Sequence, residues 1–270
     1  MGPEAISVSQ INLYLTCSLK YRFQYIDRLP RLVQSASLVF GGAMHKGLEW
    51  LHKERRNGRT PPLDEVLRVF EADWHAQILD AEVIFPDDDS KEKLVHKGKE
   101  LLSQYYHLPP RPVRDAEVYF QLPLVNPATG EALDVPLRGV IDLVNADDTI
   151  DEFKTAAKRF SLEDLPDHIQ LTAYSYAFEL LYGRPPKDLR LITFLRTKNP
   201  DIDVQVTGRD KADYERLFNL GKEVLKAVRA GVFIPSRGCW LCKDCEYDPD
   251  CREWTGNEEE VMVGGQTAGQ

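Results

Sequence analysis

The sequence predicts an α/β (α+β) fold, with a mixed central sheet of about five strands flanked by helices and a helical region on its N-terminal side. Three observations predict this class. Apolar residues recur at helical spacing up to about residue 110. After Pro109-Pro110 the spacing changes to the alternation typical of strands. Helical and strand-like segments then follow one another to about residue 230.

The N-terminal part is predicted to hold four helices. Ser9 has the chemistry of an N-cap for the first helix, and Gly41-Gly42 opens the second. Pro61-Pro62 and Pro109-Pro110 punctuate the region, because proline cannot continue a helix. The expected helices cover residues 10–25, 41–56, 63–79 and 91–106.

The C-terminal part is predicted to hold the sheet. Three strands come first, at 116–125, 134–145 and 149–155. A helix over 166–181, closed by Gly183, precedes strands at 189–196 and 201–207 and a long amphipathic helix over 209–230. We expect one domain over 1–254, made of a helical part (6–110), a core (111–230) and a cysteine-bearing segment (231–254), followed by a flexible tail (255–270).

The composition limits the cellular compartment and the kind of partner that we expect for the chain. The chain has 270 residues, a net charge of −9 and five cysteines, and no apolar run reaches the roughly 20 residues that span a bilayer. Residues 1–10 have neither the basic start nor the apolar core of a signal peptide. We therefore expect a cytoplasmic protein with no membrane partner, in which cysteines bind metal and do not form disulfides. The acidic balance argues against a broad nucleic-acid-coating surface.

Two carboxylates form the sharpest local signal. If Ala146-Asp147-Asp148 is a hairpin loop, Asp142 lies directly opposite Glu152, and Lys154 shares the face of Glu152. Carboxylates that close repel each other unless a cation lies between them, so the pattern predicts a divalent metal site. The alternative is an ordinary solvated strand face, and a register slip of one residue would replace Glu152 by Asp151.

Asp142 followed by Glu152-x-Lys154 on a hairpin resembles the PD-(D/E)XK nuclease superfamily. The chain is most similar to its RecB-type iron–sulfur exonuclease branch, which includes AddB-type nuclease domains and the CRISPR-adaptation exonucleases. The motifs that carry this resemblance occur in the family's order: Ser7, Ser9 and Cys17; Gly41 to His45; Gly139 to Asp142; Glu152 to Thr155; Gln170, Leu171 and Tyr174.

The resemblance implies a restriction-endonuclease-like core that uses Mg²⁺ or Mn²⁺. The implied metal ligands are His45, Asp142, Glu152 and the backbone carbonyl of Phe153, and the implied catalytic residues are Asp142, Glu152, Lys154, Gln170 and Tyr174. Glu117 matches a further acidic position. Lys154 either orients the attacking water or acts as the base, and the sequence leaves both roles open.

The cysteines complete the resemblance. Cys242, Cys245 and Cys251 have the spacing of the iron–sulfur branch, and Cys17 lies on the first helix, so this branch implies a [4Fe-4S] cluster on these four thiolates. Cys239 is the fifth. It offers an alternative, a local zinc site made by Cys239, Cys242, Cys245 and Cys251.

Together these features imply a metal-dependent DNA exonuclease that acts on single-stranded or end-containing DNA in repair, recombination or CRISPR spacer acquisition. A helicase or a CRISPR integrase is a candidate partner besides DNA. A basic channel is expected near Lys154, Lys158 and Arg159. The competing interpretations are a catalytically silent DNA-binding scaffold with the nuclease fold, a zinc-binding interaction module and a restriction endonuclease.

Overall fold

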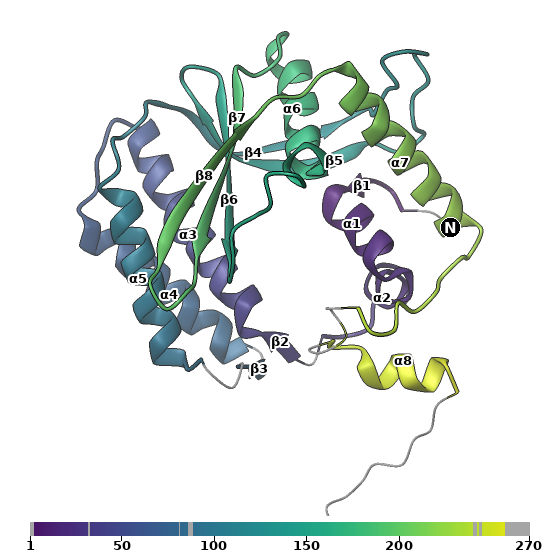
Figure 1. Ribbon diagram of the computed structural model, residues 1–270, viewed down its shortest axis with the longest axis horizontal. Helices are drawn as coiled ribbons and strands as arrows, with labels where there is room; N and C mark the ends of the chain where they lie inside the picture. Colours follow the sequence, from purple (N-terminus) through teal and green to yellow (C-terminus); the bar gives the residue numbers. More distant parts are fainter. Residues whose placement is uncertain are drawn as a thin grey trace, which may run out of the picture.

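The protein is described by a computed structural model that covers residues 3–31, 33–80, 82–85, 89–239, 242 and 245–256. Its main sheet has six strands (Figure 1). They are β1 (Ile6–Ser7), β4 (Val113–Leu122), β5 (Leu137–Asn145), β6 (Thr149–Ala156), β7 (Asp188–Leu195) and β8 (Asp201–Thr207). The five predicted strands are all present, and β1 is an addition too short to read from the sequence.

The sheet is mixed and is organised around β5. One edge of β5 pairs with antiparallel β4 along nearly its whole length. The other edge is shared, because β6 pairs with it at residues 143–144 and β1 at residues 137–138. On that edge, the pairing of β5 with β1 and β6 leaves out residues 139–142. Beyond β6, the strand β7 runs parallel and β8 antiparallel to its neighbour.

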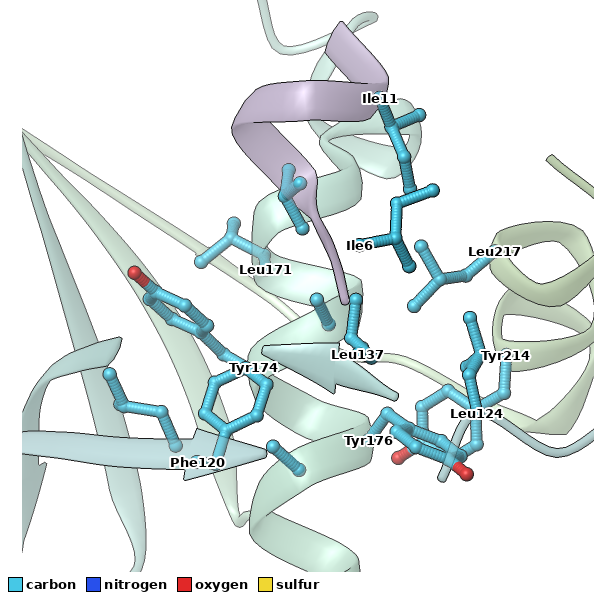
Figure 2. Packing of buried hydrophobic residues seen from close by; sticks show 14 of the residues in the cluster. Ile6, Ile11, Phe120, Leu124, Leu137, Leu171, Tyr174, Tyr176, Tyr214 and Leu217 are labelled. Carbon is cyan, nitrogen blue, oxygen red and sulfur yellow. The ribbon is translucent and has the colours of Figure 1, made fainter. Parts of the chain in front are cut away.

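Helices cover both faces of the sheet (Figure 1). The helices α3 (Ala36–Arg56), α4 (Leu63–Asp80) and α5 (Lys91–Tyr106) enclose one apolar core. The helices α1 (Val8–Thr16), α6 (Ile169–Tyr182) and α7 (Lys211–Arg229) enclose the other, part of which is drawn in Figure 2. Burial on both faces explains why β7 is mostly apolar, whereas β6, buried over most of its length, carries the charged residues Asp151, Glu152 and Lys154. No helix among the described residues is long and apolar enough to cross a membrane.

The prediction of one unbroken helix over 10–25 is wrong. The segment divides into α1, α2 (Ser18–Tyr21) and a π-helical turn (Arg22–Ile26), with Cys17 extended between the first two. The N-cap is Ser7 and not Ser9, because Ser7 and Gln10 form a reciprocal capping box.

The second helix begins five residues earlier than predicted. Ser35 caps α3 by accepting a hydrogen bond from the backbone of Leu38, so Gly41 and Gly42 lie inside the helix. These glycines serve close packing: a Cβ at Gly42 would lie 2.9 Å from the Gln77 side chain of α4. Gly42 therefore allows α3 and α4 to approach closely and does not mark the start of a helix.

The remaining differences are at boundaries. The strand expected over 134–145 begins at Leu137, and the strand expected over 116–125 runs from Val113 to Leu122. The pair β2 (Val33–Ser35) and β3 (Glu82–Ile84) and the last described helix α8 (Asp248–Trp254) were not predicted. Most of the expected tail, from residue 257 on, lies outside the described residues.

His52 of α3 gives the fold a specific acid sensitivity. The ring is 3% exposed, stacks on Phe153 at 5.7 Å and lies 3.0 Å from the Tyr105 hydroxyl through Nε2. Burial lowers the pKa of His52 to about 3. The unfolded chain protonates this histidine below its ordinary pKa near 6.5 and the folded chain does not, so unfolding takes up a proton.

We expect the free energy of unfolding to fall by about 1.4 kcal/mol per pH unit from this residue alone as pH drops from 6.5 towards 4. Urea titrations at stepped pH values measure this slope. His52→Phe keeps the stacked ring but has no titratable group, so its slope should be shallower by one proton. Equal slopes for the two proteins would contradict the assignment.

Candidate active site

At Glu117, the side chains of β4 and β5 switch from one face of the sheet to the other. The paired residues Ala116 and Leu143 belong to the core under α3–α5, whereas the next pair, Val118 and Ile141, packs into the core under α6 and α7. A regular pleat would put both pairs on one face. Glu117 has a φ of 54°, a left-handed conformation that costs a residue with a Cβ about 1–2 kcal/mol. The pleat therefore breaks here without a shift of register, and the pair Glu117–Asp142 is missing from the ladder.

This break gathers three ligand-bearing side chains. One atom each from His45 of α3, Glu117 of β4 and Asp142 of β5 lies within 4.8 Å of the others. Asp142 is only 8% exposed, and one of its oxygens accepts a hydrogen bond from the Phe153 N–H at 2.8 Å. The Asp142 side chain thus accepts the backbone hydrogen bond of β6 just beyond the pair Leu143–Asp151, and this bond fixes its position.

His45 is held in one tautomer. Its Nε2 lies 3.0 Å from the Phe153 carbonyl oxygen, which only accepts hydrogen bonds, so Nε2 carries the proton. The other nitrogen, Nδ1, is 3.8 Å from Asp142 Oδ2. Burial lowers the pKa of His45, which favours the neutral ring with a free lone pair on Nδ1. The Phe153 carbonyl, predicted as a metal ligand, serves here as the partner that orients His45.

A second row of side chains starts at Glu152. The Lys154 ammonium lies 2.5 Å from Glu152 Oε1 and donates to Gln170 Oε1 at 2.7 Å, and the Gln170 amide donates to the Tyr174 hydroxyl at 2.8 Å. Gln170 and Tyr174 are one turn apart on α6, whose first turn is capped by the His168 side chain. Tyr174 also packs edge-on against Phe120 in the core (Figure 2).

The carboxyl groups of Asp142 and Glu152 lie close together, and this proximity shifts the pKa values of the site. Burial and the neighbouring Glu152 charge raise the pKa of Asp142 well above its ordinary value. Burial opposes the charge of Lys154, but the carboxylates of Glu152 and Asp142 outweigh it and raise the pKa of the ammonium. Lys154 therefore carries a proton in the protein as it stands, which favours a charge-balancing role over a basic one.

The predicted register is confirmed. Leu143 pairs with Asp151 and Val144 with Ile150, the same register that sets Asp142 opposite Glu152. Asp151, the alternative ligand, points to the other face, where it is 2% exposed and lies 3.4 Å from the Arg190 guanidinium.

The basic channel expected near Lys154, Lys158 and Arg159 does not form as predicted. Lys154 is engaged by Glu152, and Arg159 forms ion pairs with Asp201 and Asp203. These pairs neutralise two of the three predicted cations.

The donor set fits a divalent cation. Two carboxylates and a neutral imidazole converge, and oxygen-rich sites of this kind suit Mg²⁺ or Mn²⁺. Glu152 adds an unsatisfied group: its Oε2 is buried and has no hydrogen-bond partner among the residues that the structure describes. A buried oxygen without a donor is costly, and a cation would satisfy it. Glu152 itself is not among the three gathered ligands, whereas Glu117 is.

Four of the five cysteines line one pocket. Cys17, Cys242, Cys245 and Cys251 surround it together with Lys20 and Arg237. Cys239 is not among the lining residues, although its sulfur lies 3.6 Å from that of Cys242. The lining set is the one that the iron–sulfur resemblance implies, and it differs from the zinc alternative in containing Cys17.

Ser18 ties this pocket together, a role that the sequence did not reveal. Its hydroxyl accepts from the Ile234 N–H at 2.7 Å and donates to the Ile234 carbonyl at 3.1 Å. Lys20 adds an ion pair with Glu246 at 2.6 Å. The C-terminal segment is therefore fastened to α2 by hydrogen bonds and an ion pair, and Figure 1 shows α8 close to α2.

Comparison with solved structures finds proteins of similar fold. A candidate exonuclease from Eubacterium rectale superposes with a TM-score of 0.60 at 14% identity, covering 99% of this chain and 94% of that one. SSO0001 gives a TM-score of 0.35 at 14% identity, covering 91% and 93%. At these identities the first likeness shows the fold alone. No curated protein matches the chain.

The sequence itself matches a family model over residues 5–252, nearly the whole chain. That stretch includes both carboxylate strands, the histidine of α3 and all five cysteines. The mixed sheet has the restriction-endonuclease-like arrangement that the motifs predicted. The chain belongs to the PD-(D/E)XK nuclease superfamily.

Proposed function

We propose that the protein is a metal-dependent DNA exonuclease. The observation that carries the proposal is the convergence of His45, Glu117 and Asp142 beside the Glu152–Lys154 pair. Membership of the nuclease superfamily supports hydrolysis of a phosphodiester, and the structural likeness to a candidate exonuclease supports action at strand ends.

Each side chain has a distinct task in this proposal. His45, Glu117 and Asp142 would hold a divalent cation, with Glu152 turning its unsatisfied oxygen to the same ion. Such an ion, when bound, lowers the pKa of water and stabilises the charge that develops on the phosphate. Lys154, protonated between Glu152 and Gln170, places a positive charge where a phosphate oxygen becomes more negative. Gln170 and Tyr174 fix the direction of that ammonium.

Metal binding should be visible without any substrate. Because only the folded chain gathers the ligands, Mn²⁺ at a hundred times its dissociation constant is expected to stabilise the protein by about 2.7 kcal/mol. Thermal melts with and without Mn²⁺ measure this. Glu117→Gln should reduce the shift. Glu49→Gln is the matched control, since Glu49 is a nearby carboxylate already engaged by Lys46 and Lys53. Equal shifts in both variants would remove Glu117 from the site.

The exonuclease assignment is tested by comparing linear and circular single strands of the same sequence. With Mn²⁺ present, the linear strand should be shortened and the circle should persist. Labels at the 5′ and the 3′ end then reveal the direction of cleavage. Cleavage of the circle at the rate of the linear strand would point to an endonuclease and overturn this assignment.

We further propose that Cys17, Cys242, Cys245 and Cys251 hold a [4Fe-4S] cluster. Four thiols around one pocket suit such a cluster chemically, and the pocket lies against the apolar cluster of Leu19, Phe23 and Tyr247. Its role would be to fasten the segment after α7 to α2. Anaerobic purification followed by iron, sulfide and zinc analysis tests this, and stoichiometric zinc without iron would favour the alternative.

A further inference from the structure

One stretch of the sheet face beside the candidate site is open. Along β4, Tyr119 and Gln121 alternate with the core residue Phe120, and along β5, Arg138 and Val140 lie opposite them. The helices α3–α5 cover Ala116 and Leu143 on this face but not the four residues beyond them, of which Tyr119, Gln121 and Arg138 are exposed and Val140 is half-buried. We call them the open β4–β5 face.

Tyr119 dominates this face. It is 62% exposed, unusually high for a large aromatic ring in a strand, and its hydroxyl donates to Gln121 Oε1 at 2.8 Å. It lies two residues along β4 from Glu117, and its partner Val140 lies two residues along β5 from Asp142. Two residues of a strand span about 6.6 Å. The ring is therefore adjacent to the site where a scissile phosphate would be held.

A polar pocket continues the face away from the site. It has a volume of about 350 Å³ and includes Arg138 in its lining. The residues that line it are Pro3, Glu4, Ala5, Gln10, Gln24, Tyr25, Arg28 and Arg138. Arg28 holds a left-handed backbone with φ 54°, which directs a loop residue into this position. The lining offers two guanidinium groups against one carboxylate.

The cations of this face differ from those on α3 in having no acidic partner within the described part of the chain. The nearest cations on α3 are already paired, Arg56 with Asp115 and Lys46 and Lys53 with Glu49. The side chains of Arg28 and Arg138, by contrast, form no ion pair or hydrogen bond with the residues that the structure describes. Two guanidinium groups without such a partner therefore lie in one pocket that adjoins the exposed ring of Tyr119 through Arg138.

We propose that the open β4–β5 face and its pocket bind the single DNA strand whose end enters the candidate site, an inference that rests on the proposed function. Tyr119 would stack on a base near the scissile phosphate, and Arg138 and Arg28 would bind phosphates further along. An exposed aromatic ring flanked by unpaired cations is the combination that binds single strands without sequence preference. A duplex hides its base faces, so it offers Tyr119 nothing to stack on.

Binding can be measured apart from cleavage. With EDTA present to exclude a divalent ion, the anisotropy of a fluorescein-labelled oligothymidylate reports affinity alone. Tyr119→Ala should weaken binding about tenfold, and Tyr119→Phe should stay within about threefold of the unchanged protein, since stacking needs the ring and not the hydroxyl. Val206→Ala, at another exposed strand position (59% exposed) on β8, is the matched control. Because Tyr119 is exposed, thermal melts of its variants should be unchanged.

The cations are tested by salt. Each phosphate contact contributes about 0.7 to the slope of log affinity against log salt for a single strand, so Arg138→Ala should lower that slope by about this amount. Lys226→Ala, a paired surface lysine on α7, should not. Unchanged affinity in Tyr119→Ala within an active nuclease overturns this inference alone. Tyr119-dependent binding in a protein that cleaves nothing with Mn²⁺ supports it and overturns the proposed nuclease activity.

Discussion

Asp142→Asn is expected to lower the rate of DNA cleavage at least a thousandfold and to leave the protein folded. The change removes one charged ligand from the three donors that gather at the site among the described residues. A metal that stabilises the transition state by several kcal/mol contributes about three powers of ten to the rate. Asparagine keeps an oxygen that accepts the Phe153 N–H, so the local backbone should hold.

The same variant should be more stable than the unchanged protein when no metal is present. Asp142 and Glu152 are both buried and repel each other, which is why the pKa of Asp142 is raised. A neutral amide relieves this repulsion. Thermal melts in EDTA, run beside cleavage assays with Mn²⁺, should show a higher midpoint together with lost activity. A lower midpoint would mean that Asp142 serves mainly to hold the fold.

Asp151→Asn is the control for this prediction. Asp151 is the carboxylate directly before Glu152 and is also buried, but it faces Arg190 on the opposite side of β6. Its loss should cost about 1–3 kcal/mol of unfolding free energy and leave the cleavage rate of the folded protein unchanged. If Asp151→Asn abolished cleavage and Asp142→Asn did not, the register that assigns the site would be wrong.

Cys17→Ser is expected to abolish cluster assembly and to loosen the C-terminal segment. A [4Fe-4S] cluster contains four iron atoms. Among the cysteines that line the pocket, Cys17 is the one that comes from the N-terminal helical region. We expect the iron content to fall from about four atoms per chain to near zero, and the thermal midpoint to fall with it. Iron analysis of anaerobically purified protein checks the first result, and melting checks the second.

Cys239→Ser is the matched control, because Cys239 lies near Cys242 but outside the pocket lining. It should keep the iron and the melting temperature of the unchanged protein. The opposite pattern, in which Cys239 is essential and Cys17 is dispensable, would establish the local zinc site as the correct interpretation.

The sequence was informative where neighbours along the chain decide the structure. A three-residue loop between two apolar strands fixed the pairing of β5 with β6, and that pairing set Asp142 opposite Glu152. The four-residue spacing of Gln170 and Tyr174 likewise needed only the geometry of one helix. The order of the predicted strands followed from the same local periodicity.

Prediction from the sequence failed where residues far apart along the chain determine the local structure. The break at Cys17 depends on Ser18 binding the backbone of Ile234, a contact across 216 positions that no local pattern contains. Gly42 suggested a helix start, but its lack of a side chain reflects the approach of α4. The left-handed backbone of Glu117 is favoured by no local sequence rule, yet it brings the third ligand to the site.

The hydrogen bonds between Ser18 and Ile234 also have a consequence for biosynthesis. The two partners are 216 residues apart, and a ribosome adds about 5–20 residues per second, so α2 waits about 10–40 s for the segment that covers it. During that time Cys17 is present without Cys242, Cys245 or Cys251. Any iron–sulfur group that requires all four thiols is therefore inserted after translation has passed Cys251. By then all strands of the sheet have been synthesised.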